Sequence, residues 1–371
     1  MHPTDLVLET LCHKPAMGGS EVLEAWNEAD ARGLSEFIRV EAAAVWLYVR
    51  FKELHCEPRG PDGERFWHWL TKEAKRIAAK RMLVDSQTSV LSRHLSDIDV
   101  PFVLIKGSAR QRATHLYPFV AARDTNDLDV LIPENSAETT HDYLRAIGYD
   151  YAFAPELTPE GHYHLRPLAD ESSVPVELHV STGSQVPPAE AWRRNTDGSV
   201  EISGEGVSYR IPSATELLWH GITHGVFHEA RAYRLRFLLD ATAILASDVT
   251  IDWSTIDQRL DSVETDNREQ TVAWLGAAAW LAGVTLPEQI TKGVKPFPLR
   301  RVMRWRLVVF RNKRLTPRMR EKLLEEGTRV EAGMSQLPTI PGSSLPVRMR
   351  RRTAAAAARA SYLTWRFLHR D

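Results

Sequence analysis

The sequence has few of the features that mark secreted, membrane or disulfide-stabilised proteins. Cysteine occurs twice in 371 residues, at Cys12 and Cys56, without a CxxC pair. This spacing frames no disulfide set and no zinc site, and it favours a reducing cytoplasm. The N-terminus lacks a basic start followed by an apolar core, so no signal peptide is expected. The longest uncharged apolar run, 271–287, falls short of a membrane span and ends in proline, which predicts a buried helix.

Acidic residues are scarce in the C-terminal region of the chain. The net charge is −1, but from Lys292 to the end there are 20 Lys and Arg against 5 Asp and Glu. The remainder holds 27 basic and 43 acidic residues. A basic C-terminal region could bind phosphate, RNA or an anionic surface. It could also pack against the acidic part of the chain with its arginines solvated, and we favour this second interpretation.

Periodicity divides the chain into four parts. Residues 1–97 carry apolar side chains at helical spacing, and a compact mixed α/β unit follows at 98–212. Helical spacing returns over 213–334, and 335–371 reads as a Pro/Gly/Ser linker and a basic terminal helix. We therefore expect an α+β fold, in which a small mixed β-sheet is flanked by N-terminal and C-terminal helical regions.

Short apolar and β-branched runs predict the strands of this central unit, and polar segments between them predict its helices. The expected strands are 100–107, 126–133, 149–155, 162–170 and 173–180, followed by a hairpin over 199–212; the expected helices are 108–117 and 135–149, the second closing at Gly148.

The run 126–133 reads NDLDVLIP and places two acids inside a predicted strand. Side chains alternate along a strand, so Asp127 and Asp129 share one face, with Cα atoms roughly 6–7 Å apart. Unpaired carboxylates are costly to bury, and a divalent cation such as Mg²⁺ or Mn²⁺ would remove that cost. Chance alone gives about six acid-x-acid triplets in this composition. An edge strand whose acids pair with arginines is therefore an open alternative.

A second predicted strand repeats the pattern. In 174–180 the apolar side chains share one face, and Glu177 and His179 share the other. Three carboxylates from two neighbouring strands can hold two metal ions, an arrangement used for displacement at phosphorus. Pro175 fits the start of such a strand or an edge position.

A glycine turn lies upstream, in IKGSA at 105–109. Gly107 allows close backbone approach, and the helix expected after it offers free N–H groups to a phosphate. Strand-glycine-helix junctions are also ordinary turns. The sequence contains no P-loop, GxGxxG or HExxH motif, so phosphate chemistry would depend on this turn and the acids together.

Taken together, these residues resemble the polymerase-beta-like nucleotidyltransferase superfamily, and in particular its family of uncharacterised bacterial nucleotidyltransferases. The resemblance covers roughly 100–245. Its matching elements are Ile105-Lys106-Gly107-Ser108, Tyr117-Pro118, Arg123, Asp127-Leu128-Asp129, Val130-Leu131, Glu177-Leu178-His179, His220, His224 and Leu239-Asp240.

The resemblance implies a role for each site residue. Gly107 and Ser108 would hold the triphosphate. Asp127 and Asp129 would bind both metals, and Glu177 would complete the site and help deprotonate the acceptor. Glutamate stands here where aspartate is commoner in the superfamily.

Three further residues are candidates for contact with the nucleotide. Arg123 could pair with phosphate oxygens through its planar fork, or it could neutralise Asp124 or Asp127. Lys106 could face the site or extend along the strand end towards solvent. His179 shares the face of Glu177.

The implied activity is transfer of a nucleoside monophosphate from ATP or another nucleoside triphosphate to an acceptor hydroxyl, with release of pyrophosphate. The acceptor could be a small molecule, a peptide or protein, or a tRNA end. The alternative is a degenerate nucleotidyltransferase that binds RNA or a partner through its basic end. His220, His224 and His228, at i, i+4 and i+8, could bind a transition metal or line a polar helix face.

Overall fold

The structure is a computed structural model with two compact units. The described residues are 1–29, 33–116, 123–153, 163–170, 174–183, 186–204, 207–227, 234–263, 265–311, 320 and 323–324. The first unit comprises Met1–Ala74, Gly221–Ala246 and Asp252–Asp371, and the second comprises Lys75–His220 and Ser247–Ile251. The four predicted domains and the boundaries between them stay predictions. The predicted linker and terminal helix at 335–371 lie outside the described residues.

The described part of the first unit is helical. It contains α1 (Pro3–Leu11), α2 (Gly19–Glu28), α3 (Leu34–Val40), α4 (Ala44–Glu53), the start of α5 (Gly60–Asp97), a π-helix (Thr223–Phe227), α10 (Leu235–Leu245), α11 (Trp253–Asp261), α12 (Thr265–Ala282), α13 (Glu288–Thr291) and α14 (Leu299–Arg311). Of the apolar run 271–287 that was predicted to be a buried helix, residues 271–282 form the second half of α12, and 283–287 lie beyond its end. Trp274, Leu275 and Leu281 of the run are buried, whereas Trp280 is exposed. Among the described residues, no helix is long and apolar enough to span a membrane.

Arginines of α14 form ion pairs with acids of the N-terminal helices. Arg300 pairs with Glu9, and Arg304 pairs with Asp5, so two bases one helical turn apart match two acids of α1. Arg306 donates from Nε to Glu41 Oε1 at 2.7 Å. For these three arginines the structure agrees with the interpretation that the basic region packs against acidic parts of the chain. The expectation that its arginines are solvated is wrong for Arg306, which is buried.

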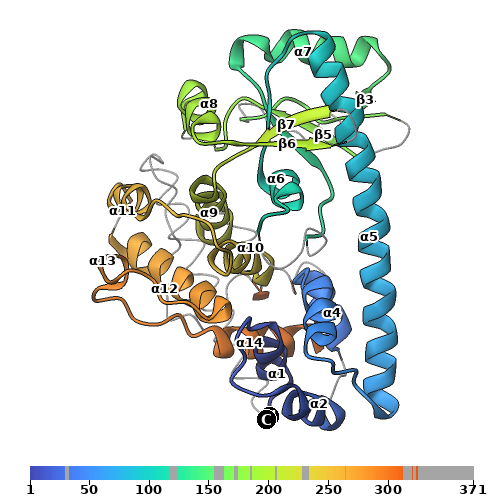
Figure 1. Cartoon of the computed structure of the whole chain (residues 1–371), viewed down its shortest axis with the longest axis vertical. Coiled ribbons are helices and arrows are strands. Elements are labelled where there is room, and N and C mark those ends of the chain that lie inside the picture. Colours follow the sequence, from blue (N-terminus) through green and yellow to red (C-terminus); the bar gives the residue numbers. More distant parts are fainter. Residues whose placement is uncertain are drawn as a thin grey trace. The chain divides into compact units, whose positions relative to one another are not determined.

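The second unit contains a seven-stranded mixed sheet with helices on both sides. Its strands are β1 (Val103–Leu104), β2 (Leu128–Leu131), β3 (Asp150–Tyr151), β4 (Leu168–Ala169), β5 (Val176–His179), β6 (Val200–Gly204) and β7 (Val207–Ile211), in the order β3-β4-β5-β2-β1-β7-β6. The helices that follow them are α6 (Lys106–Arg112), α7 (Ala137–Ala146), α8 (Pro188–Thr196) and α9 (Ala214–Ile222). Figure 1 shows α6 and α7 on opposite sides of the sheet. The fold is α+β, as the sequence predicts.

Two neighbouring strands at the centre of the sheet are buried for the reason that the sequence suggested. β2 pairs in parallel with β5 and antiparallel with β1, so all four of its residues are buried. A strand covered on both faces needs a nearly continuous apolar run, which 126–133 supplies. Pro175 stands just before β5, where it removes no N–H from the ladder and its carbonyl accepts from Leu128 N at 2.7 Å.

Some predicted boundaries differ from the observed ones. β2 begins at Leu128, so Asp127 lies one residue before the strand rather than within it. α6 begins at Lys106, two residues earlier than expected. Lys106 has φ +51°, which turns the chain directly from β1 into the helix. α8 lies in a polar stretch that was not predicted as a helix, and it opens with Pro188 at its first position.

Candidate functional site

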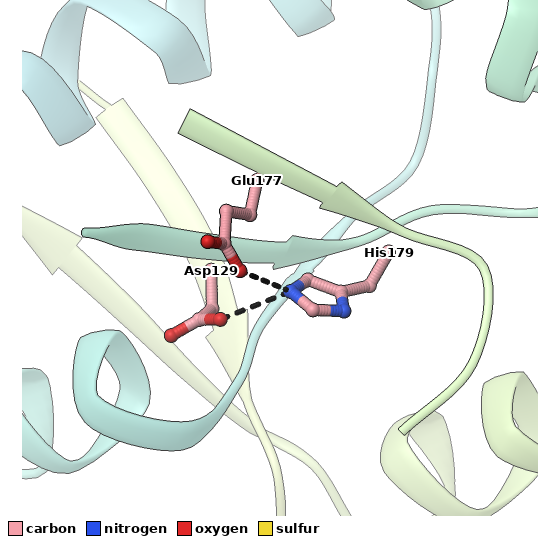
Figure 2. A group of neighbouring side chains, drawn as sticks. All are labelled: Asp129, Glu177 and His179. Atoms are coloured by element: carbon pink, nitrogen blue, oxygen red, sulfur yellow. Dashed lines mark hydrogen bonds and ion pairs between the residues drawn. The ribbon is translucent and has the colours of Figure 1, made fainter. Parts of the chain in front are cut away.

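The candidate site is built by the register of β2 and β5. Asp129 pairs directly with Glu177, and two residues further on Leu131 pairs with His179. Because strand side chains alternate, Asp129, Glu177 and His179 project from the same face of the sheet. One ligand atom from each lies within 4.8 Å of the others. Figure 2 shows the imidazole pointing between the two carboxylates.

His179 connects the two acids. Its Nε2–H donates to Asp129 Oδ1 at 2.9 Å, and Glu177 Oε2 lies 3.4 Å from the same nitrogen (Figure 2). The side chain is fully buried, and its Nδ1 has no hydrogen-bond partner among the described residues. Tyr163 stacks on the imidazole ring, with centroids 5.7 Å apart, and the His164 ring lies 5.1 Å away. Packing therefore fixes the ring with Nε2 towards the carboxylates.

Lys106 supplies the positive charge of the group. Its Nζ donates to Asp129 Oδ1 at 2.7 Å and lies 4.0 Å from Glu177 Oε2. It is also 3.3 Å from His179 Nε2 and 5.6 Å from the centroid of the Tyr163 ring. Of the two interpretations drawn from the sequence, the structure therefore has the lysine facing the site.

The charges shift the pKa values of the three acids in different directions. Burial alone raises the pKa of Asp129, but Lys106 and the hydrogen bond from His179 lower it more, and it ends below its usual value. Burial raises the pKa of Glu177 as well, but the hydrogen bond from His179 and the charges of Lys106 and His179 together lower it more, so this pKa also ends below its usual value. For Asp127, burial and the charges of Asp129 and Glu177 raise the pKa to about 6.

Asp127 stands at the edge of this group. Within the described residues, the cluster of ligand atoms contains Asp129, Glu177 and His179 but not Asp127. Its carboxyl nevertheless feels the charges of Asp129, Glu177 and Arg123. Its raised pKa is that of a buried carboxyl next to two other acids, and a bound cation would reverse this shift.

The residues of the glycine turn, Gly107 and Ser108, contact β2 and the segment that leads into it. The Ser108 hydroxyl is buried, accepts from Asp129 N–H at 2.8 Å and donates to the Asp127 carbonyl at 3.3 Å. A Cβ on Gly107 would come within 3.0 Å of Thr125 Oγ1, so this position packs closely against the chain entering β2. The hydroxyl and the glycine that the resemblance assigns to the triphosphate thus join α6 to the strand that carries the acids.

Arg123 and Asp124 lie just before these acids. Arg123 Nη1 donates to the Asp124 carbonyl at 3.1 Å, and its charge lowers the pKa of Asp127 in opposition to burial. The Asp124 carboxylate pairs with Arg76 and Lys80 of α5, each at 3.3 Å. Asp124 is therefore neutralised by α5, and Arg123 contributes positive charge near Asp127.

The residues of the site suit a divalent cation. Two carboxylates and an imidazole nitrogen lie close enough together to bind one ion. They match the ligands of Mg²⁺, Mn²⁺ and related ions. Coordination by His179 Nε2 requires its proton to move to Nδ1, the orphaned and buried nitrogen. The donor set thus fits a metal, and the histidine favours ions that accept nitrogen.

Sequence reasoning missed Tyr163 and His164. Both fall in the stretch 162–170, which was predicted only as a strand. Their aromatic side chains around His179 give no periodic signal, and the pairing of His164 with His179 as an isolated antiparallel bridge brings them there. Of the three spaced histidines, His220 lies in α9 and His224 in the π-helix, and His228 falls outside the described residues.

Comparison with known families agrees with this geometry. A sequence model of the family described as uncharacterised nucleotidyltransferase matches residues 27–281, more than half of the chain. The chain belongs to this nucleotidyltransferase family. It is therefore an enzyme of a class that transfers nucleotidyl groups, for which a nucleoside triphosphate is the implied substrate and divalent metals are the general cofactors. No curated protein and no solved structure matches the chain. The matched segment includes the whole candidate site, whereas α1 and α14 lie outside it.

Proposed function

We propose that the chain is a metal-dependent nucleotidyltransferase that moves a nucleoside monophosphate from a triphosphate to an acceptor hydroxyl and releases pyrophosphate. The observation that supports it best is the convergence of Asp129, Glu177 and His179 from paired positions of β2 and β5. Asp127, Asp129 and Glu177 are the proposed metal ligands, with His179 as an additional nitrogen donor. A bound Mg²⁺ or Mn²⁺ would act as a Lewis acid towards the phosphoryl oxygens.

The acids have different proposed tasks because their exposure differs. The side chain of Glu177 is 18% exposed and that of Asp129 is 4% exposed. Glu177 is therefore the better placed to take the proton of the acceptor hydroxyl while its oxygen attacks the α-phosphorus. The bond from the α-phosphorus to the bridging oxygen breaks, and pyrophosphate leaves with that oxygen. Before a metal binds, Asp129 is held in place by the hydrogen bond from His179.

The basic side chains are proposed to neutralise the triphosphate. Lys106 and Arg123 lie on the two segments that lead into the site, and each interacts electrostatically with Asp127. The planar guanidinium of Arg123 can bind two phosphate oxygens at once. Gly107 and Ser108 are proposed to shape the turn on which the phosphates lie, in addition to their contacts with β2.

The alternative, an RNA-binding or partner-binding module, would depend on the basic C-terminal region. Arg300, Arg304 and Arg306 of that region already pair with acids of the N-terminal helices. The intact acidic cluster favours the enzyme. The two candidates separate in one measurement: RNA affinity of a binding module falls steeply with salt and is indifferent to Asp129→Asn.

The test is transfer of α-³²P from each of the four nucleoside triphosphates, with Mg²⁺ or Mn²⁺, to acceptors in a cell extract. The size of the labelled product separates small molecules, proteins and tRNA. We expect Asp129→Asn and Glu177→Gln each to lower labelling on the order of 10³-fold, because metal stabilisation supplies several kcal/mol. Asp150→Asn, an aspartate 84% exposed at the edge strand of the same sheet, is the matched control. Labelling that survives both acid substitutions would refute the proposal.

A further inference from the structure

Lys106 occupies the space that a metal ion would need. Its Nζ lies 2.7 Å from Asp129 Oδ1, 3.3 Å from His179 Nε2 and 4.0 Å from Glu177 Oε2. These are the three residues whose ligand atoms cluster within 4.8 Å. The ammonium is thus already the counter-ion of the carboxylates, and the Lys106 side chain is 16% exposed.

The ammonium and a divalent ion cannot share these ligands. A metal binds carboxylate oxygen at about 2 Å, so a lysine still bonded to the same Asp129 oxygen would lie less than about 5 Å from it. Two cations at that distance repel strongly in a partly buried site. Metal binding therefore requires Lys106 to leave Asp129.

The backbone directs this side chain into the site at a conformational cost. Lys106 has φ +51°, a left-handed conformation that glycine adopts readily and side-chain-bearing residues rarely do. Such strained positions persist where the surrounding structure holds them, and they gather at functional sites. The strained backbone and the three contacts of Nζ are two independent observations, and both indicate a functional role for the ammonium at this site.

We propose that Lys106 is an exchangeable counter-ion, which neutralises Asp129 and Glu177 in the metal-free site and moves to the triphosphate when a divalent metal takes its place. This inference rests on the proposed function and specifies how its site is loaded. The metal is bound against competition from the lysine, and the triphosphate gains the positive charge of Lys106 only in the metal-bound state. Lys106 is a binding residue that changes its partner.

Two binding measurements test this with Lys106→Met, which keeps the length of the side chain and removes its charge. Binding of Mn²⁺ alone, measured by electron paramagnetic resonance, is expected to become about tenfold tighter, because the competing charged hydrogen bond is gone. Binding of inorganic tripolyphosphate at saturating Mn²⁺, measured by calorimetry, is expected to become about tenfold weaker. A merely structural lysine would weaken both. Lys75→Met, an exposed lysine of α5, should change neither.

A second variant keeps the test decisive if Lys106→Met does not fold. Lys106→Arg retains the charge and offers Asp129 a bidentate partner, so Mn²⁺ should bind several-fold more weakly while tripolyphosphate binding persists. Unchanged Mn²⁺ affinity in either folded variant would overturn the exchange. If the wild-type chain bound no divalent ion at all, the proposed function would fail first; if it bound Mn²⁺ and transferred label while Lys106→Met bound it no tighter, only this inference would fail.

Discussion

Asp129 on β2 and Glu177 on β5 stand at a directly paired position of two parallel strands, with His179 between their carboxylates. The site is therefore set by strand register rather than by loop conformation. A slip of one residue would turn Glu177 to the other face of the sheet. Ser108 adds a second constraint, because its hydroxyl accepts a hydrogen bond from the backbone N–H of Asp129 in β2.

Metal binding should stabilise the second unit. Adding Mn²⁺ at 100 times its dissociation constant should raise the free energy of unfolding by about 2.7 kcal/mol, because only the folded site binds it. Circular dichroism melts with and without Mn²⁺ measure this. The shift should vanish in Asp129→Asn and persist in Asp150→Asn. A shift of equal size in both variants would place the metal elsewhere.

Ser108→Ala should act through stability. The substitution removes a buried hydroxyl that bonds Asp129 N–H and the Asp127 carbonyl, and we expect a loss of about 1–3 kcal/mol. Urea unfolding measures the loss, and label transfer with each triphosphate shows whether KM rises as well. A raised KM without any loss of stability would mean that the hydroxyl binds phosphate and that its contacts with β2 are unimportant.

Glu41 should be essential to the first unit. Its carboxylate is fully buried, pairs with buried Arg306 and accepts from Leu235 N at 2.8 Å at the start of α10. Glu41→Gln removes the buried negative charge that pairs with Arg306 and should cost about 3–5 kcal/mol of unfolding free energy. Glu36→Gln, which breaks an ion pair exposed on both sides, should cost less than about 1 kcal/mol. Similar urea midpoints for the two variants would contradict the buried pair.

Both thiols should be unreactive in the folded protein. Burial raises the pKa of Cys12 to about 12 and that of Cys56 to about 11. The reactive thiolate forms only as the pH approaches the pKa, so a raised pKa keeps both thiols protonated at pH 8. Ellman's reagent should detect no thiol in native protein and two in denaturant. Rapid native labelling at pH 8 would show that one of the cysteines is accessible.

Most of the candidate site could be predicted from the alternation of side chains along two strands. Alternation in NDLDVLIP and VPVELHV predicted that acids and His179 share faces of neighbouring strands, and β2 and β5 are indeed adjacent and in register. The contacts of Lys106 could not be predicted, because they depend on a positive φ at a residue that is not glycine. Asp127 lies outside the strand because the ladder begins only at Leu128, which a hydrophobic run cannot indicate.

The helical regions were predicted as helices, but the contacts between these helices were not predicted. The basic character of α14 was visible, but its pairing with α1 joins residues nearly 300 positions apart, and a charge count cannot assign partners at that separation. α8 was missed because its polar residues resemble a loop until Pro188 is seen to start a helix.

The most direct test of the account is the position of a bound metal. Crystals of the full chain soaked with Mn²⁺ should show an anomalous peak about 2 Å from carboxylate oxygens of Asp129 and Glu177, with Lys106 Nζ moved away from Asp129. A peak at any other place, or Lys106 still bonded to Asp129 in crystals saturated with Mn²⁺, would contradict it.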